Sequence, residues 1–429
     1  MSRWRITGGR VIDPAAGVDR ITDLYLADGL VVALDTAPDG FEAERELDVT
    51  GQVVCPGLVD LSACLREPGH EHKASIASEA AAAAASGVTT LCCPPDTDPV
   101  IDTPAVADLI THRAAGVGLV RVHPLGALTQ GLGGERLSEM AALKAAGCAG
   151  VTNLLHPIRD TQLLRHALAY AATFDLTVFL HPDEPWLRAS GCVHEGEVSA
   201  RLGLTGIPAV AETIGVARDL ALVAHTGVRA HFCRLSTAAA VRLVAAARAE
   251  GLPVTADVSA HQLHLTEIDV SDYDSLCHVL PPLRTQRDRD ALRAAVADGT
   301  VDAICSDHQP HEAEAKLAPL AETEPGISAL ETLLPLALRL VDDGLLDLPT
   351  ALARLTCGPA AVLGGTAGTL HPGRAADICI FAPDRPWQVD PARLRSRGRN
   401  TPFAGWEFAP RVTHTLLGGE LVFRLDAPA

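Results

Sequence analysis

The chain has 429 residues, of which 48% are hydrophobic, and a formal net charge of −18. This composition supports a large buried core, and the length allows one large domain with a smaller one. The negative charge argues against a surface that binds nucleic acid or an anionic membrane, and no apolar run approaches the roughly 18 residues of a membrane span. The eleven cysteines form no Cys-x-x-Cys pair, which is typical of reduced thiols, so we expect a cytoplasmic protein.

The first fifty or so residues predict short strands separated by turns, at 5–12, 23–34 and 47–54. Strand-and-turn character returns at the other end of the chain, at 377–382 and 411–423. Because both ends are rich in strands, we expect the termini to meet. They then form one small β-sandwich-like domain from residues 1–54 and 361–429.

Between these ends, short apolar runs alternate with helical stretches. The apolar runs occupy 53–64, 88–94, 120–128, 150–155, 176–182, 228–236, 253–260 and 301–308. The helical stretches occupy 73–86, 103–115, 136–146, 161–173, 208–226, 238–250, 287–297 and 327–341. Eight strand–helix units predict a closed parallel (β/α)8 barrel over residues 55–360, and a doubly wound open sheet is the alternative.

In such a barrel, catalytic residues come from the C-terminal ends of the strands. The segments at those ends resemble the dihydroorotase family of the amidohydrolase superfamily, and the resemblance covers nearly the whole chain. The segments that carry it are Pro56-Gly-Leu-Val-Asp-Leu61, Leu65-Arg-Glu-Pro-Gly69, Glu195-Gly-Glu-Val-Ser-Ala-Arg-Leu-Gly-Leu204, Pro281-Pro-Leu-Arg284, Ser306-Asp-His-Gln-Pro-His311 and Gly368-Thr-Leu-His-Pro-Gly373. The resemblance implies a barrel of the metal-dependent amidohydrolase type, which hydrolyses a cyclic amide with two zinc ions.

The family binds zinc through six ligands, and four of these positions are degenerate here. The ligands that the resemblance implies are a His-x-His at strand 1, a bridging carboxylate at strand 4, one histidine each at strands 5 and 6, and an aspartate at strand 8. The degenerate positions are Ser62 and Cys64 for the His-x-His, Asn153 for the carboxylate and Arg234 for the strand 6 histidine.

Two ligand positions survive, His181 and Asp307, and the second matches the family's proton shuttle. A catalytic zinc usually has three protein ligands, and a guanidinium is always protonated and cannot coordinate a metal. We therefore expect no metal and a vestigial Asp307, with Arg234 paired to Asp307 as a hypothesis. The open alternative is a mononuclear zinc site formed by Cys64, His181 and Asp307.

The positions that resemble substrate contacts are also altered. Arg66 matches the family arginine that holds the substrate carboxylate, and His308 and His311 remain. Asp96 replaces an asparagine, and its charge is expected to repel an anionic substrate. Leu280 replaces a second asparagine and cannot form a side-chain hydrogen bond.

Two further expectations concern the surroundings of this site. The segment 311–325 matches the loop that closes over substrate in active members, and here we expect it to be mobile. His231 precedes Arg234 by an odd number of residues, so in a regular strand the two side chains are expected to lie on opposite faces.

The sequence leaves three hypotheses for function. The first is a pseudoenzyme in pyrimidine biosynthesis, a structural or regulatory partner of aspartate transcarbamoylase catalytic chains in a hetero- or homo-oligomer. The segments 174–178 and 184–186 resemble that inactive branch of the family. The second is an active zinc-dependent dihydroorotase, or another cyclic amidohydrolase with a reduced metal site. The third is a sensor that binds an anionic metabolite at Arg66, His308 and His311.

Overall fold

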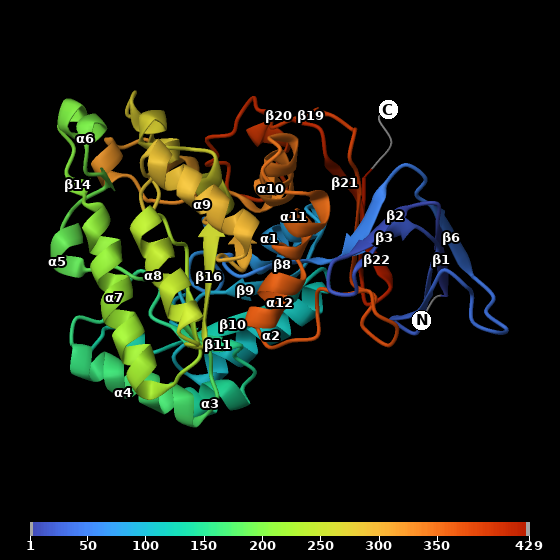
Figure 1. The fold of residues 1–429 in the computed structure, drawn as a ribbon, viewed down its shortest axis with the longest axis horizontal. Helices are drawn as coiled ribbons and strands as arrows, with labels where there is room; N and C mark the ends of the chain where they lie inside the picture. The colour runs from blue at the N-terminus through green and yellow to red at the C-terminus, as the bar shows by residue number, and fades with distance from the viewer. Residues whose placement is uncertain (1–2, 426–429) are drawn as a thin grey trace.

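The computed structural model describes residues 3–425, and its centre is an eight-stranded parallel sheet that curls into a barrel (Figure 1). In chain order the strands are β8 (Leu58–Asp60), β9 (Val88–Cys93), β10 (Arg121–Ala127), β11 (Gly150–Thr152), β12 (Val178–Leu180), β15 (Ala230–Phe232), β16 (Val254–Ser259) and β17 (Ala303–Cys305). Each strand pairs in parallel with the next one in that order. The predicted (β/α)8 barrel is confirmed.

The first and last strands of the sheet are joined just beyond their C-terminal ends. The amide of Cys64 donates to the carbonyl of His308 at 2.9 Å, and the amide of His308 donates to the carbonyl of Ser62 at 3.1 Å. These bonds close the ring at the end where catalytic residues of a barrel lie. Ser62 and Cys64, two of the degenerate ligand positions, therefore take part in closing the barrel.

Helices cover the outside of the barrel, and each predicted helical stretch contains one. They are α1 (Ile76–Ala85), α2 (Pro104–Val117), α3 (Met140–Ala145), α4 (Thr161–Thr173), α7 (Ala209–Thr226), α8 (Ala238–Ala249), α9 (Gln286–Asp298) and α10 (Leu333–Asp342). Two shorter helices, α5 (Pro185–Arg188) and α6 (Glu197–Leu202), lie between α4 and α7, and two more, α11 (Leu348–Ala353) and α12 (Cys357–Val362), follow α10. The stretch predicted at 327–341 becomes α-helical only at Leu333, because Ile327 extends the sheet by bridging His308.

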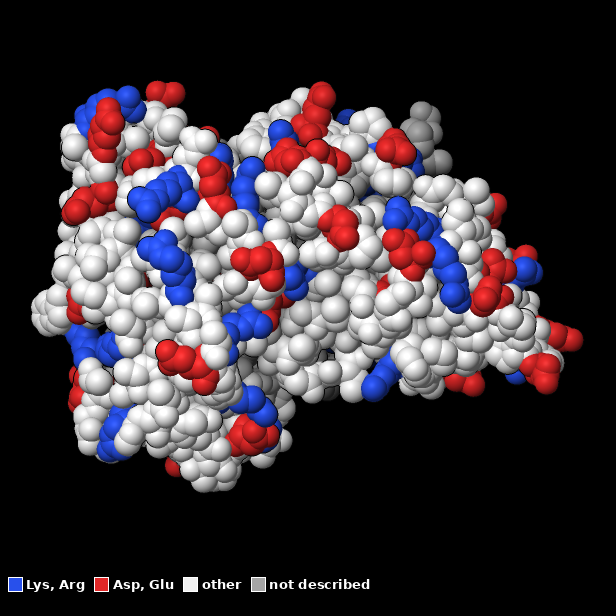
Figure 2. Space-filling model, viewed as in Figure 1, with Lys and Arg blue, Asp and Glu red and all other residues white. Residues whose placement is uncertain are grey.

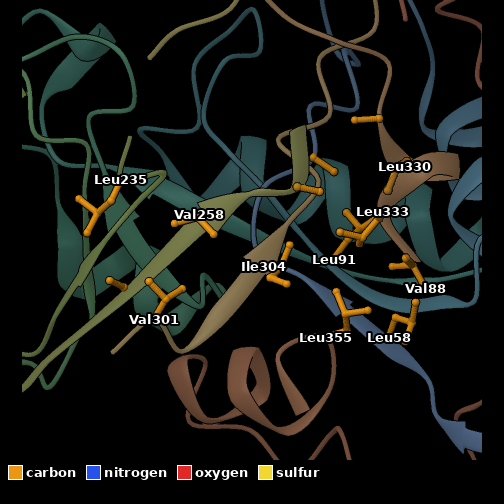
Figure 3. Packing of buried hydrophobic residues seen from close by; sticks show 14 of the residues in the cluster. Leu58, Val88, Leu91, Leu235, Val258, Val301, Ile304, Leu330, Leu333 and Leu355 are labelled. Atoms are coloured by element: carbon orange, nitrogen blue, oxygen red, sulfur yellow. The ribbon is translucent and has the colours of Figure 1, made fainter. Parts of the chain in front are cut away.

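The main core lies between the strands and the surrounding helices. Strand residues such as Leu58, Val88 and Ile304 point toward helix and loop residues such as Leu333 and Leu355, and all of them are buried (Figure 3). A parallel strand covered on both faces needs apolar residues on both, which explains why the sequence shows continuous runs rather than alternation.

Both ends of the chain form a β-rich domain beside the barrel (Figure 1). One sheet has four strands, in the order β5 (Leu30–Leu34), β4 (Leu24–Ala27), β1 (Trp4–Thr7) and β6 (Arg45–Asp48). The other has six, in the order β22 (Glu420–Arg424), β21 (Arg411–Leu417), β18 (Ile378–Ala382), β7 (Val53–Pro56), β2 (Arg10–Asp13) and β3 (Val18–Ile21). A second core draws on both sheets and includes Ile6, Leu26, Val54 and Ile380. Two short ladders complete the strands, β13 (Val193–His194) with β14 (Gly206–Ile207) and β19 (Trp387–Gln388) with β20 (Glu407–Phe408).

Three apolar runs that predicted single strands are each divided by glycine in the structure. The run 5–12 breaks at Gly8, where φ is 74°, and the run 47–54 breaks at Gly51, where φ is 79°. In both cases the first half joins the four-stranded sheet and the second half joins the six-stranded one. The run 53–64 breaks at Gly57, where the chain leaves the terminal sheet as β7 and enters the barrel as β8. A left-handed φ favours glycine at the first two sites, and close packing requires it at the third.

The charges are spread rather than concentrated. On the face shown in Figure 2, basic and acidic side chains are scattered among uncharged residues. Among residues 3–425, no helix is both long enough and apolar enough to span a lipid bilayer.

Gly57→Ala tests the close packing at the junction between the two domains. A methyl group at Gly57 would lie 2.1 Å from Oγ1 and 2.7 Å from Cβ of Thr89, which is buried and β-branched and cannot turn away. We expect the free energy of unfolding, measured by urea denaturation, to fall by about 1–3 kcal/mol.

Gly116→Ala is the matched control for this substitution. Gly116 lies in α2, and no atom comes within 4 Å of an added Cβ. Alanine should therefore leave stability unchanged or raise it by up to about 1 kcal/mol. Equal effects of the two substitutions would show that the packing at Gly57 is not constraining.

Candidate functional site

All six ligand positions of the family lie just beyond the C-terminal ends of barrel strands. Ser62 and Cys64 follow β8, Asn153 follows β11, His181 follows β12, Arg234 follows β15 and Asp307 follows β17. The fold thus places these side chains around one end of the barrel, which we call the mouth. Whether they can bind a metal depends on which of these side chains are in contact.

Arg234 and Asp307 form a buried ion pair in the mouth. Nη1 of Arg234 lies 2.8 Å from Oδ1 of Asp307, and the two side chains are 4% and 2% exposed. Nη2 of Arg234 donates to Nδ1 of His181 at 3.4 Å. The pairing that the sequence offered as a hypothesis is confirmed, and the guanidinium contacts both surviving ligand positions.

This pair sets the protonation of the surviving ligands. Burial alone would raise the pKa of Asp307, but the guanidinium of Arg234, with smaller contributions from His261 and Gln309, holds that pKa below its ordinary value. Burial, and then the charge of Arg234, lower the pKa of His181 well below its ordinary range. Asp307 is therefore ionised with a cation already beside it, and His181 is neutral with its Nδ1 lone pair occupied.

Asn153 is fully engaged with the loops around it. Its Oδ1 accepts from the amide and hydroxyl of Thr129 at 3.2 and 2.8 Å, and its Nδ2 donates to the carbonyls of Leu132 and His156 at 3.3 and 2.9 Å. An amide has two donors and one acceptor atom, and all are satisfied here. Asn153 thus fastens two loops and presents no carboxylate to a metal.

Cys64, the best candidate for a replacement ligand, is a buried neutral thiol. Burial, followed by the nearby charge of Asp96, raises the pKa of Cys64 well above its ordinary value. Zinc binds the thiolate, so this environment opposes coordination.

A zinc site does not fit this set of residues. Within residues 3–425, the one group of three or more His, Cys, Asp or Glu ligand atoms within 4.8 Å of one another is His231, Cys233 and Asp257. Cys64, His181 and Asp307 therefore do not converge as a mononuclear site would require. A fixed guanidinium between His181 and Asp307 also repels a divalent cation.

The group of His231, Cys233 and Asp257 lies below the mouth, inside the barrel. His231 bonds through Nε2 to Oδ2 of Asp257 at 2.9 Å and through Nδ1 to the hydroxyl of Thr255 at 2.8 Å. The other oxygen of Asp257 accepts the backbone amide of Arg234. Since both nitrogens and both oxygens have partners, the group is a buried polar network that supports Arg234.

The expectation that His231 and Arg234 lie on opposite faces is wrong. The ring of His231 packs edge-on to Phe179 in the barrel interior, with centroids 5.3 Å apart, and Arg234 also points inward to Asp307. Strand β15 ends at Phe232, and Arg234 has a left-handed φ of 54°, so the alternation of a regular strand does not extend to it.

The arginine that resembles the family's substrate contact is bound by the chain itself. Nη1 of Arg66 lies 2.8 Å from Oδ2 of Asp96, with side chains 10% and 12% exposed, and Nε donates to the carbonyl of Pro310 at 3.1 Å. Asp96, expected to repel a substrate carboxylate, supplies a carboxylate to Arg66. The anion-binding arginine is thereby neutralised.

His311 lies beside Arg66 but carries no charge. Burial, and then the cations of Arg66, Lys73 and Lys316, lower the pKa of His311 to about 2. Nε2 of His311 lies 3.0 Å from the carbonyl of Pro325 and 3.2 Å from Nη2 of Arg66, and Nδ1 lies 3.2 Å from Nζ of Lys73. Both ring nitrogens therefore contact groups of the chain itself.

His308 points away from the mouth. Its Nε2 donates to Oε2 of Glu79 in α1 at 2.7 Å, and its Nδ1 accepts the amide of Ala329 at 2.9 Å; the side chains of His308 and Glu79 are fully buried. Burial alone would raise the pKa of Glu79, but the interactions with His308, Ser396 and Ser78 together outweigh it and lower that pKa. His308 is therefore a core residue rather than a substrate contact, and a glutamate within an alanine-rich helix was the signal that a buried partner exists.

The segment 311–325, expected to be mobile, is fastened across the mouth. Lys73 pairs with Glu324, and Nζ of Lys316 donates to the carbonyl of Glu324 at 2.6 Å. The amide of His311 donates to Oδ1 of Asn400 at 2.9 Å. His181 lines two cavities in the mouth, of about 20 and 30 Å³. Small-molecule pockets begin near roughly 300 Å³, so these two cavities are far too small for a cyclic amide.

Arg234→Met tests how strongly Asp307 depends on its cation. Removing the guanidinium leaves a buried carboxylate unpaired, and we expect the free energy of unfolding to fall by about 3–5 kcal/mol in urea denaturation. Arg242→Met, at an exposed position of α8, is the control and should change it little.

The double variant Arg234→Met, Asp307→Asn distinguishes a lost pair from lost packing. Because it removes both charges, it should be more stable than Arg234→Met alone. A double variant as unstable as the single one would contradict the role given to the ion pair.

Comparisons with known proteins agree with this geometry. The family model described as dihydro-orotase-like matches residues 51–240. A dihydroorotase-like protein of Pseudomonas aeruginosa is 54% identical over 416 residues, covering 97% of this chain and 98% of that protein. A dihydroorotase of Anaeromyxobacter dehalogenans is 45% identical over 423 residues and 98% of each chain. The solved structure of L-hydantoinase (dihydropyrimidinase) from Arthrobacter aurescens superimposes with a TM-score of 0.87 at 23% identity, over 98% of this chain and 96% of that one, and this shows the shared fold. The chain therefore belongs to the dihydroorotase-like family of the amidohydrolase superfamily.

Proposed function

We propose that this chain is a non-catalytic dihydroorotase-like subunit, which acts as a structural or regulatory partner of aspartate transcarbamoylase in pyrimidine biosynthesis. The observation that carries the loss of catalysis is the Arg234–Asp307 pair. It occupies the two positions where the family's strand 6 and strand 8 ligands belong. A relative at 54% identity carries the name dihydroorotase-like protein rather than dihydroorotase.

The mouth supports the same proposal independently of the metal positions. Hydrolysis of a cyclic amide needs room for the ring, a group that binds its carboxylate and a means of activating water. Here Arg66 is held by Asp96, and the segment above is pinned by Lys73 and Glu324. None of these contacts needs a ligand to form.

The partnership with aspartate transcarbamoylase rests on the resemblance of segments 174–178 and 184–186 to the inactive branch of the family. The second of these includes Trp186, a residue that is 74% exposed, and the guanidinium of Arg159 lies 4.9 Å from the centroid of its ring. Exposed tryptophan and arginine are the side chains that most often anchor a protein partner. We therefore propose that Trp186 and Arg159 form part of the partner surface.

A second candidate function is an active zinc-dependent dihydroorotase or another cyclic amidohydrolase with a reduced metal site. The observation that favours it is that several relatives at 42–45% identity carry the name dihydroorotase. The two candidates differ in zinc content and in turnover, so one preparation can decide between them.

The deciding measurement is dihydroorotate hydrolysis by the purified chain in buffer with zinc. An active zinc dihydroorotase assayed in parallel serves as the control for the assay. We expect no turnover above background and less than stoichiometric zinc after dialysis, because Arg234 occupies the ligand position. Turnover together with bound zinc that is lost in Cys64→Ala would favour the second candidate.

The partnership is tested by mixing the chain with aspartate transcarbamoylase catalytic chains and measuring sedimentation velocity. We expect a complex larger than either component. A chain that sediments alone at all mixing ratios would refute the partnership.

Trp186→Ala probes the surface used in that complex. Loss of a large exposed anchor should weaken the complex by at least about tenfold. Leu317→Ala, at a residue 79% exposed in the segment over the mouth, is the control and should leave it unchanged.

A further inference from the structure

A cleft lies where the C-terminal segment meets the barrel helices, away from the mouth. It encloses about 500 Å³. One wall comes from the end of α1 and the start of α10, and the other from strands β21 and β22 with the loop around β19. The lining residues include Glu331, Leu334, Arg393, Arg395, Arg411 and Phe423. Small-molecule sites occur preferentially between domains and in this range of volume.

The cleft concentrates positive charge in a chain whose net charge is −18. Arg393, Arg395 and Arg411 line it. Among residues 3–425, neither Arg395 nor Arg411 forms an ion pair, and Arg393 meets only Asp390, at 3.5 Å with both side chains largely exposed. Burial, and then the charges of Arg385 and Arg393, lower the pKa of Arg411. The charge of Arg411 is therefore opposed by neighbouring cations rather than neutralised by a carboxylate.

Two of the guanidinium groups are positioned by aromatic rings instead of carboxylates. The guanidinium of Arg395 lies 5.1 Å from the ring centroid of Phe423, and that of Arg411 lies 5.8 Å from the ring centroid of Trp387. Stacking of this kind orients a guanidinium while leaving its N–H donors available. Within residues 3–425, these guanidinium groups are thus oriented by rings and make no side-chain hydrogen bond.

The carboxylates that line the cleft bind backbone amides. Oε1 of Glu331 accepts from the amides of Arg395 and Ser396 at 2.7 and 3.1 Å, and Oδ1 of Asp390 accepts from the amide of Ala392 at 2.9 Å. They shape the loop that carries the arginines. Leu334, Pro335 and Val412 add an apolar surface to the same cleft.

From these observations we propose that the cleft binds a phosphorylated metabolite of nucleotide size. The arginines hold the phosphate through charge-assisted hydrogen bonds, and the apolar wall packs against the rest of the ligand. A free phosphate ion fills only the cationic part of the cleft, so the apolar part distinguishes the two sources of phosphate.

Isothermal titration calorimetry of the full chain at low ionic strength tests this proposal. The probes are adenosine and uridine 5′-monophosphates, ribose 5-phosphate, adenosine and inorganic phosphate. We expect at least one nucleotide to bind with a dissociation constant below about 1 mM, and adenosine and inorganic phosphate to bind at least about tenfold more weakly.

Arg395→Gln with Arg411→Gln is the decisive variant. It keeps the size and polarity of the side chains and removes two charges, so nucleotide affinity should fall at least about tenfold. Arg242→Gln, on the exposed face of α8, is the control and should bind as the unmodified chain does. Thermal unfolding checks that both variants are folded.

Three results would overturn the proposal. The first is the absence of binding by either nucleotide at millimolar concentration. The second is inorganic phosphate that binds as tightly as the nucleotides, because the apolar wall then contributes nothing. The third is nucleotide binding that persists unchanged in the folded double variant, which would place the ligand elsewhere.

Discussion

The buried ion pair between Arg234 and Asp307 is the interaction on which the mouth of this barrel depends. In a zinc amidohydrolase the strand 8 carboxylate is compensated by metal ions, which carry positive charge. A carboxylate at the same depth without such a cation would cost several kcal/mol. Arg234, which follows strand β15, supplies one positive charge and also contacts His181. The aspartate can therefore remain buried and ionised without a metal ion beside it.

The same exchange of charge occurs at the rim. Arg66 resembles a residue that meets a substrate carboxylate, and Asp96 now provides that carboxylate from the end of the neighbouring strand. In both places a side chain of the protein supplies the charge that a ligand would otherwise bring. Arg234 supplies a positive charge to Asp307, and Asp96 supplies a negative charge to Arg66. Both of these charge pairs form without a ligand, and Lys73 contacts His311 and pairs with Glu324 in the segment above.

The sequence predicted the barrel well because parallel strands that are covered on both faces consist of continuous apolar runs, and such runs are visible in the sequence. It predicted the ends less well. Hydrophobicity marked the runs around Gly8, Gly51 and Gly57, but it does not reveal that the chain changes sheets at a glycine. The mouth positions were found through motifs. The partners of Arg66, His308 and His311 were not, since Asp96, Glu79 and Lys73 lie 30, 229 and 238 residues away in sequence. Strand parity failed for His231 and Arg234 because the strand had already ended.

The ion pair also opposes the creation of a zinc site at this mouth by a single substitution. Replacing Arg234 with histidine would restore one ligand, but it would remove the cation that compensates Asp307 before any metal could do so. The remaining positions would still offer a hydroxyl at Ser62, a neutral thiol at Cys64 and an amide at Asn153 whose hydrogen bonds are already used. Stability and coordination therefore favour different residues at position 234. A working zinc site becomes stable only when several ligands return together, whereas the present pair is stable by itself.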